Sequence, residues 1–135
     1  MDEFWYMYVK QKVFDKIKKK SMPYLSKYEG IYFTDQAVVR KPPSFPCVEI
    51  TELPGVEAGM TLENEDVAGY LATFQVKVYS EKSEDVARDV MSEIANHFKK
   101  DLHFSMTAMP ITTQNGDNWV GVIRFRRMIG GGDKL

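Results

Sequence analysis

Two histidines are the first candidates for acid–base or metal chemistry. His97 falls near the end of an expected helix and His103 near the start of the segment that follows it. A helical zinc site needs histidines at positions i and i+4 with a glutamate beside the first, and that HExxH spacing is absent. We therefore expect two surface or boundary histidines and no metal site.

The chain has one cysteine, Cys47. A single cysteine excludes an intrachain disulfide and a cysteine-rich zinc site. Cys47 follows Pro46 inside an expected strand, with no helix N-terminus after it that would lower the thiol pKa. The interpretation is a half-buried structural cysteine, and a reducing cytoplasm fits best.

Carboxylates concentrate in Leu62–Asp66 (LENED), where Glu63, Glu65 and Asp66 could bind Ca²⁺ or Mg²⁺. The segment lacks the spacing and central glycine of an EF-hand loop, so we expect a solvated loop. Gly130–Gly132 follow an expected strand but precede no helix, which argues against a phosphate-binding loop. No Ser-His-Asp arrangement is evident. The sequence predicts no catalytic residues, no cofactor and a protein that is not an enzyme.

Basic residues gather in the first expected helix and the last expected strand, and aromatic residues make up 13% of the chain. Sheets that carry aromatics and arginines can bind single-stranded nucleic acid. However, the RNA-recognition motif is absent, and the net charge of -1 provides no global field for nucleic acid. A small nucleic-acid-binding regulator is kept as an alternative. The basic residues are Lys10, Lys12, Lys16, Lys18, Lys19, Lys20, Arg124, Arg126 and Arg127.

The bulk composition is that of one folded domain. The 135 residues are 44% hydrophobic and 27% charged, enough for a core without disulfides or metal. The first residues, MDEFWYMYVKQKV, place acids before a short aromatic run and lysines after it. This order is the reverse of a secretory signal, and no run of ~20 apolar residues is present. We expect a soluble protein made in the cytoplasm, with no membrane partner.

Two amphipathic helices must position these residues. The first is expected over 4–20, with an apolar residue at every fourth position from Trp5, and Ser21-Met22-Pro23 should end it. The second should begin after the N-cap Ser83 and end at Lys99-Lys100. Its apolar stripe consists of Val86, Val90, Ile94 and Phe98.

Alternating apolar residues predict strands over 47–53, 66–80, 102–112 and 119–129. Between the first two, Pro54–Glu65 is expected to be a long loop or a ragged hairpin tip, and long loops are often functional. Gln114–Asp117 is a strong hairpin turn, because Asn-Gly tolerates positive φ angles. In the segment 23–46 we expect a turn at 28–30 and short extended pieces at 31–33 and 37–40.

The element order α-β-β-α-β-β predicts an α+β domain. We expect an N-terminal helix and a mostly antiparallel sheet of four strands, or slightly more, with both helices on one face. A single domain should cover residues 1–129, and residues 130–135 should form a flexible glycine-rich tail. Free sheet edges of such a domain could pair with another subunit.

The wording of several segments resembles the tail-terminator (tail-completion, minor tail) proteins of long-tailed bacteriophages and prophages, in their lambda-type α+β form. The likeness spans most of the chain, from the first helix to about Ile129. The segments that carry it are Lys41–Ile50 (KPPSFPCVEI), Asn64-Glu65, Phe74–Ser80 (FQVKVYS) and Ile123–Arg127 (IRFRR).

The resemblance implies a mechanical role in the virion and no catalytic residues. Such proteins cap the growing tail tube as a ring, usually of six copies, end tube elongation and offer a surface to the head-side connector. The implied partners are other copies of the chain, the tail-tube protein and the head-completion or connector protein, with genomic DNA passing through the ring. Another neck or head-completion protein of the same virion is the nearest alternative.

Two sets of residues are expected to carry this role. Loop length and exposure favour two contact loops, and clustering of charge favours a basic set that either lines the DNA channel or faces water. The expected contact residues are Pro54, Gly55, Gly59, Glu63, Glu65, Asp66, Asn115, Gly116 and Asp117. The expected basic residues are Lys18, Lys19, Lys20, Arg124, Arg126 and Arg127.

Overall fold

The structure is a computed structural model that describes residues 5–38, 41–60, 67–81, 83–108, 110–130, 133 and 135. A short 3-10 helix, Trp5–Tyr8, leads into α1 (Val9–Leu25), and α2 (Glu84–Lys100) lies between the third and fourth strands. The strands are β1 (Tyr32–Thr34), β2 (Cys47–Met60), β3 (Val67–Glu81), β4 (Ser105–Met106), β5 (Ile111–Asn115) and β6 (Asn118–Gly130).

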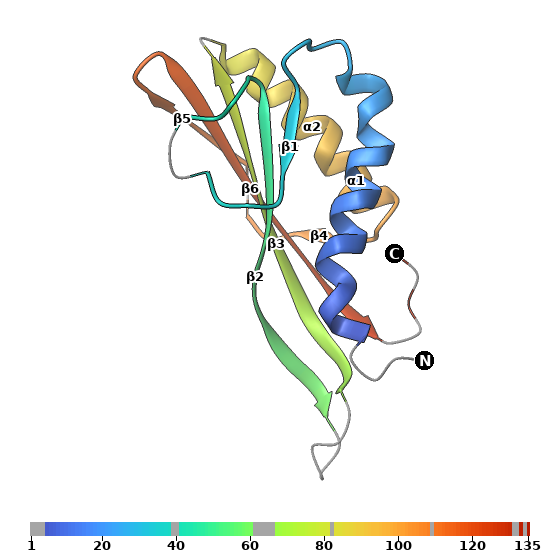
Figure 1. The fold of residues 1–135 in the computed structure, drawn as a ribbon. Helices are drawn as coiled ribbons and strands as arrows, with labels where there is room; N and C mark the ends of the chain where they lie inside the picture. The colour runs from blue at the N-terminus through green and yellow to red at the C-terminus, as the bar shows by residue number, and fades with distance from the viewer. Residues whose placement is uncertain are drawn as a thin grey trace.

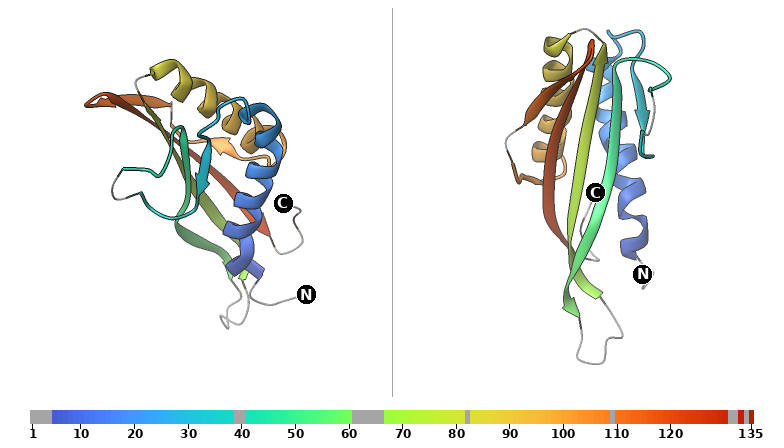
Figure 2. Two further views of the ribbon diagram at one scale, coloured as in Figure 1. Left: turned by 45° about the horizontal axis from the view of Figure 1, so that its top comes forward. Right: turned by 90° about the vertical axis from the view of Figure 1, so that its left-hand side faces the viewer.

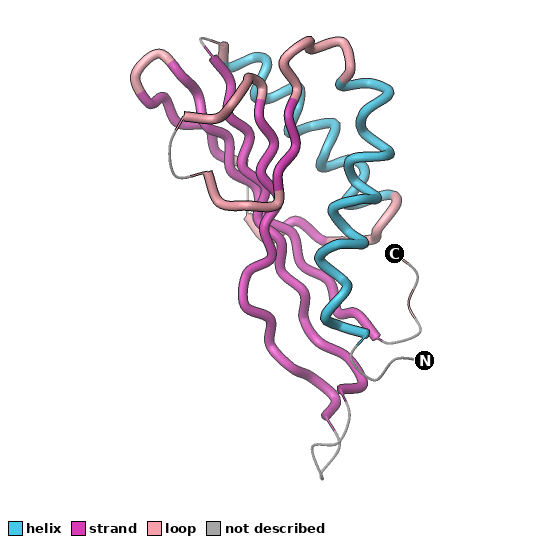
Figure 3. The backbone as a smooth tube through the Cα atoms, in the orientation of Figure 1, coloured by secondary structure: helices cyan, strands magenta, loops and turns pink. Residues whose placement is uncertain are grey.

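The strands form one mixed sheet of six strands in the order β1-β2-β3-β6-β4, with β5 on the same side of β6 as β4. Only the β1–β2 pair is parallel. Both helices cover one face of the sheet (Figures 1 and 2), and Figure 3 marks the helical and strand segments along the backbone. The predicted α+β fold with a mostly antiparallel sheet is therefore confirmed. β1 falls on the short extended piece expected at 31–33, and two strands, β4 and β5, occupy the region of the single strand expected over 102–112.

The core lies between the helices and the alternate residues of β3 and β6 that face them. Phe98 of α2 stacks on Phe125 of β6, with ring centroids 4.4 Å apart and an interplanar angle of 5°. Phe104 packs edge-on against Phe98 and Phe74, at 5.3 and 5.6 Å. Each such aromatic pair contributes about 0.5–1.5 kcal/mol beyond the area it buries, so this cluster fixes α2 on the sheet.

Helix α2 begins and ends as its sequence predicts. The hydroxyl of Ser83 accepts a hydrogen bond from the backbone N–H of Val86 at 3.3 Å, which caps the helix. Glu84 and Asp85 occupy the first turn, and Lys99 and Lys100 the last, so both charge patterns favour the helix dipole.

Helix α1 continues past Pro23 to Leu25, so the expected end at Ser21-Met22-Pro23 is wrong. Leu25 is fully buried, and the N–H of Ser26 still closes the last turn on the carbonyl of Met22 at 2.8 Å. The proline removes only one donor in the last turn. Burial of the apolar stripe, which the two extra residues extend, outweighs that cost.

A cluster on α2 fastens the end of α1. The Asp89 carboxylate accepts hydrogen bonds from the hydroxyls of Tyr24 at 2.8 Å and Tyr28 at 2.5 Å, and Lys27 lies 3.0 Å away. Burial alone would raise the pKa of Asp89, but the donors from Tyr28, Tyr24 and Lys27 lower it. The carboxylate is thus held in its charged form, and α1 is tied to α2.

The expected strand 102–112 is also wrong in its first part. His103 has a positive φ of 58°, and the N–H groups of Leu102 and Phe104 bond to the carbonyls of His97 and Phe98 at 3.2 and 2.8 Å. This is a left-handed helix end, in which orphan carbonyls find donors. Leu102 and Phe104 alternate because the chain folds back over α2, and strand pairing begins only at β4.

The expected long loop at Pro54–Glu65 is shorter than predicted, because β2 runs on to Met60. It pairs with β3 up to Met60 and Val67, with a register irregularity between Leu53 and Val56. Of the two expectations for this segment, the hairpin is the one observed, since β2 and β3 pair across it. Residues 61–66 lie outside the described part of the chain.

Two described residues of the expected tail, Asp133 and Leu135, contact the rest of the domain. Gly130 is the last residue of β6, and its N–H donates to the Asp133 carboxylate at 2.7 Å. Leu135 packs against the core. The domain limit at residue 129 and the flexibility of the tail stay predictions. No helix in the described part of the chain is long and apolar enough to cross a membrane.

Two glycines give a matched test of this packing. A Cβ at Gly30 would overlap the backbone carbonyl of Phe45, whereas a Cβ at Gly121 would meet the flexible end of the Met91 side chain. We expect Gly30→Ala to lower the free energy of unfolding by about 1–3 kcal/mol, as overpacking against rigid groups does. Gly121→Ala should cost clearly less, because Met91 can rotate away. Chemical denaturation of both variants checks this, and equal losses would contradict it.

Candidate functional site

Two side chains that could do chemistry, those of His97 and Cys47, are held by contacts within the fold. Nδ1 of His97 lies 2.5 Å from the Asp101 carboxylate at the end of α2, and this contact lowers the pKa of Asp101. Burial, and next the charge of Glu49, raises the pKa of the Cys47 thiol to about 11. Cys47 is thus a buried thiol that stays protonated at neutral pH, and a weak nucleophile. Among the described residues no group of three or more His, Cys, Asp or Glu could bind a metal ion.

The predicted contact residues lie at opposite ends of the sheet. Pro54, Gly55 and Gly59 are part of β2 in the hairpin arm, which we define as β2 from Thr51 to Met60 with β3 from Val67 to Thr73. Figure 1 shows this arm projecting beyond the end of α1. The predicted Glu63, Glu65 and Asp66 lie outside the described residues.

The second predicted loop is the turn between β5 and β6. Asn115 pairs with Asn118, so the turn residues are Gly116 and Asp117, and Gly116 has a positive φ of 65°. Positive φ at the first central position alone is the pattern of a type II′ turn. The sequence located the hairpin correctly, and Asn115 ends the strand as the last paired residue before the turn. Asn118 pairs with Glu81 and Gly130 with Gly69, so this turn and the arm lie at opposite ends of β3.

The arm has a polar anchor at its base. The Tyr70 hydroxyl donates to the Glu52 carboxylate at 2.8 Å, and the Tyr70 ring contacts Trp5 and Tyr6 with centroids 6.1 and 6.5 Å apart. Burial raises the pKa of Glu52, while the Tyr70 hydroxyl and the charge of Lys10 act against this shift. These contacts lie next to the irregularity at Leu53–Val56, where Pro54 brings no backbone N–H to the ladder.

The predicted basic residues do not form one surface. Lys18, Lys19 and Lys20 are exposed on α1. Arg124 and Arg126 alternate with the buried Ile123 and Phe125, which places them on the sheet face away from the helices. Arg127 has the opposite parity, and its guanidinium donates to the carbonyl of Leu102 at 2.7 Å.

The sheet face away from the helices, here called the open face, combines charge and exposed apolar area. Nε of Arg124 donates to the Gln75 side chain on β3 at 2.8 Å. Around this pair lie Arg126, Ile111, which is 63% exposed, and Met128, which is 53% exposed. From Ile50 onward the outer edge of β2 has no strand partner among the described residues, since β1 pairs only with Cys47–Glu49. An open face and a free edge of this kind suit contact with another protein.

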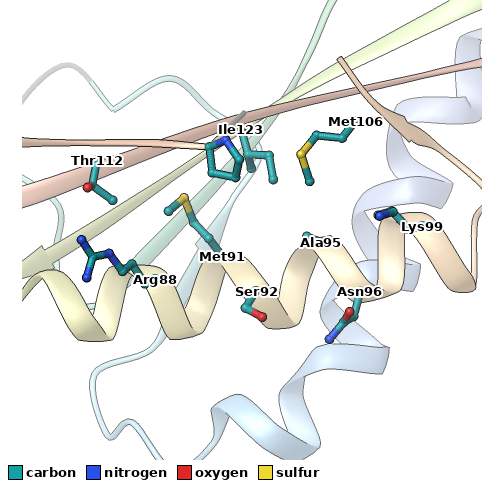
Figure 4. A pocket seen from close by; sticks show the side chains of 10 residues that line it. Arg88, Met91, Ser92, Ala95, Asn96, Lys99, Met106, Thr112 and Ile123 are labelled. Carbon is teal, nitrogen blue, oxygen red and sulfur yellow. The ribbon is translucent and has the colours of Figure 1, made fainter. Parts of the chain in front are cut away.

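A groove on the other side of the molecule was not predicted. It has a volume of about 500 Å³ and lies between α2 and the β4–β5–β6 side of the sheet. Figure 4 shows Met91, Met106 and Ile123 gathered along it. These residues are far apart in the sequence and carry no shared pattern, so sequence reasoning had no signal that would place them together.

Comparison with known protein families finds no match, and comparison with curated proteins finds none either. Among solved structures, the chain is similar to a protein chain in the structure titled "Virion of native gene transfer agent (GTA) particle". The TM-score is 0.61 at 12% sequence identity, and the match covers 91% of this chain and 95% of the other. At this identity the likeness establishes a shared fold over nearly the whole of both chains.

Glu52→Gln tests the anchor at the base of the arm. A raised pKa means that the folded state binds a proton at Glu52 more tightly than the unfolded state does, so the ionised group opposes folding above its folded pKa. We expect the glutamine variant to melt at a higher temperature than the wild type at pH 7. This difference should shrink as the pH falls toward about 4, where a carboxylate of ordinary pKa also takes up its proton.

Tyr70→Phe is the matched control for the anchor. It leaves the Glu52 carboxylate without its donor and should cost about 1–3 kcal/mol of unfolding free energy at pH 7. Thermal unfolding of the three proteins between pH 4 and 7 checks both expectations. A glutamine variant less stable than the wild type at pH 7 would show that the ionised Glu52 stabilises the fold.

Proposed function

We propose that this chain is a structural protein of a phage-like particle that assembles as a ring, caps the tail tube and joins it to the head. The observation that carries the proposal is the near full-length match to a chain of a gene transfer agent virion. The resemblance of segments such as Phe74–Ser80 to tail-terminator proteins supports the finer role.

Several features of the fold suit a ring subunit. The far end of the hairpin arm extends past α1, the outer edge of β2 beyond β1 has no strand partner in the described part of the chain, and the open face carries exposed Ile111 and Met128. A contact between two different surfaces repeats from copy to copy and closes into a ring where the rotation permits. Such a subunit needs surfaces and no catalytic set, and it would act in the virion after synthesis in the host cytoplasm.

Other components of the same particle remain as the nearest alternative. A head-completion or other neck protein would also form rings, so the ring alone does not distinguish these roles. Binding to the tail-tube protein of the same particle does, because only a tail cap must recognise the end of the tube.

Native mass spectrometry across a concentration series, with and without Mg²⁺, tests ring formation. We expect a population at six times the chain mass of 15.6 kDa, either alone or after addition of the tail-tube protein. A chain that stays monomeric at all concentrations and does not bind tube protein would refute the proposal.

Shortening the arm tests which part of the chain makes the contact. Replacing residues 58–69 by Asn-Gly joins the paired residues Glu57 and Tyr70 through a two-residue turn and keeps the anchor to Glu52. We expect a folded monomer with unchanged circular dichroism and at least a tenfold loss of assembly. Asn115→Ala with Asp117→Ala is the parallel change in the other predicted loop. If rings form normally with the shortened arm, the arm is not a contact.

The open face favours a second candidate, binding of nucleic acid. Arg124 and Arg126 project from it beside Lys77, whose cross-strand partner is Val122. If these residues contact DNA, Arg124→Gln with Arg126→Gln should weaken binding and reduce its dependence on salt concentration, since each lost phosphate contact lowers the salt slope by about one. Fluorescence anisotropy with single- and double-stranded DNA from 50 to 200 mM salt measures this. Arg127→Gln is the control, because Arg127 faces the helix side, and an equal effect would contradict the assignment.

A further inference from the structure

The groove beside α2 is lined by apolar and polar residues in about equal measure, the polar ones being Arg88, Ser92, Asn96, Lys99 and Thr112. Met91 and Ala95 of α2 form one wall, and Met106 and Ile123 lie across from them (Figure 4). Methionine side chains adapt to the shape of an incoming apolar group. A groove of this size therefore suits an extended or helical segment with small and aliphatic side chains.

The charged residues that line the groove are cations, Arg88 and Lys99. Arg88 lies 2.7 Å from Glu84 and 3.7 Å from Asp85 on its own helix, so part of its charge is already compensated. Lys99 is exposed and has no ion pair with any described residue. No carboxylate is among the described residues that line the groove, so it offers a positive end to an acidic ligand.

The hairpin arm has the complementary composition. From residue 42 to residue 76 the sequence contains no lysine, arginine or histidine. In the described arm, Glu57 is flanked by aliphatic and small residues in LPGVEAGM (53–60). The acids of residues 42–76 are Glu49, Glu52, Glu57, Glu63, Glu65 and Asp66.

The arm cannot fill the groove of its own chain. Ile123, which lines the groove, pairs with Val76 of β3, and the described end of the arm is Val67. The nine steps of extended chain between them span roughly 30 Å, and the paired strands β2 and β3 point the end of the arm away from α2 (Figure 2). A second copy of the chain is required to bring the two together.

We propose that the hairpin arm of one copy docks in the groove between α2 and β4–β5–β6 of the next copy, with Lys99 facing the acidic arm. This inference rests on the proposed ring, for which it names the two contacting surfaces. The contact is heterologous, because the arm and the groove are different parts of one chain, and such contacts can propagate around a ring.

Cross-linking between variants that each carry one added cysteine tests the contact directly. Asn96→Cys places a thiol in the groove wall, and Glu57→Cys or Ala58→Cys, tested separately, places one in the arm. The native Cys47 is buried and does not compete. A mixture of arm and groove variants treated with a short bismaleimide should give a covalent dimer. Lys12→Cys, exposed on α1, replaces the groove variant as the control and should give none.

Lys99→Glu with Lys100→Glu as the matched control tests the charge. Both lysines are exposed in the last turn of α2, but only Lys99 lines the groove. We expect Lys99→Glu to raise the concentration needed for half-maximal assembly about tenfold, with a much smaller effect of Lys100→Glu. Combining Lys99→Glu with Glu57→Lys should restore assembly in part.

The outcomes separate this inference from the proposed function. If rings form, but no arm–groove cross-link appears and Lys99→Glu assembles as well as the wild type, the docking is overturned. The proposed ring would then stand without it. Cross-linking of the Asn96→Cys variant to the tail-tube protein in place of the arm would assign the groove to that partner and also overturn it. A wild-type chain that neither assembles nor binds tube protein removes the proposed function and the docking together.

Discussion

The packing of α2 on the β3–β6 pair is the contact on which the rest of the molecule depends. Phe98 stacks on Phe125 and meets Phe74 and Phe104, so one helix position joins two strands and the chain reversal after α2. α2 has 17 residues and β3 has 15. At about 1.5 Å per residue in a helix and about 3.3 Å in a strand, the strand is roughly twice as long as the helix. The sheet must therefore extend past α2, and the 3-10 helix and α1 cover it as far as Tyr70.

Beyond Tyr70, which is buried against Trp5 and Tyr6, the arm is stable only if its backbone groups are paired and its edge does not attract unwanted strands. β2 and β3 satisfy one another up to Met60 and Val67, and the contacts of Tyr70 with Glu52, Trp5 and Tyr6 hold the base of the arm against the N-terminal end of α1. Pro54 discourages indiscriminate strand addition at this edge, because proline has no backbone N–H to donate to an added strand.

Much of the fold could be predicted because periodicity and capping report local burial. Ser83 and the stripe to Phe98 predicted α2 closely, and alternation predicted β3. The failures come from contacts distant in sequence. Leu25 and Asp89 carry α1 past Pro23, and the left-handed His103 turns the alternation of Leu102 and Phe104 into a helix end. The sequence could have placed Arg126 and Arg127 on opposite faces of the sheet, because neighbouring residues of a strand alternate. The groove could not have been predicted, because it joins α2 to residues of β4 and β6 that only the tertiary fold brings together.

The distribution of charge bears on how copies can meet. An isologous contact places each surface against itself, so arms meeting at a two-fold axis would bring Glu57 and its acidic neighbours in sequence together, and like charges repel. Some cations lie near the base of the arm, since the charge of Lys10 acts on Glu52 and Arg126 pairs across the ladder with Thr73. Lys99 lies in the groove, away from the arm of its own chain, so an acidic arm and this cation favour head-to-tail association over two-fold pairing. A net charge of -1 therefore conceals an uneven distribution of charge, and that distribution would give the proposed ring its direction of assembly.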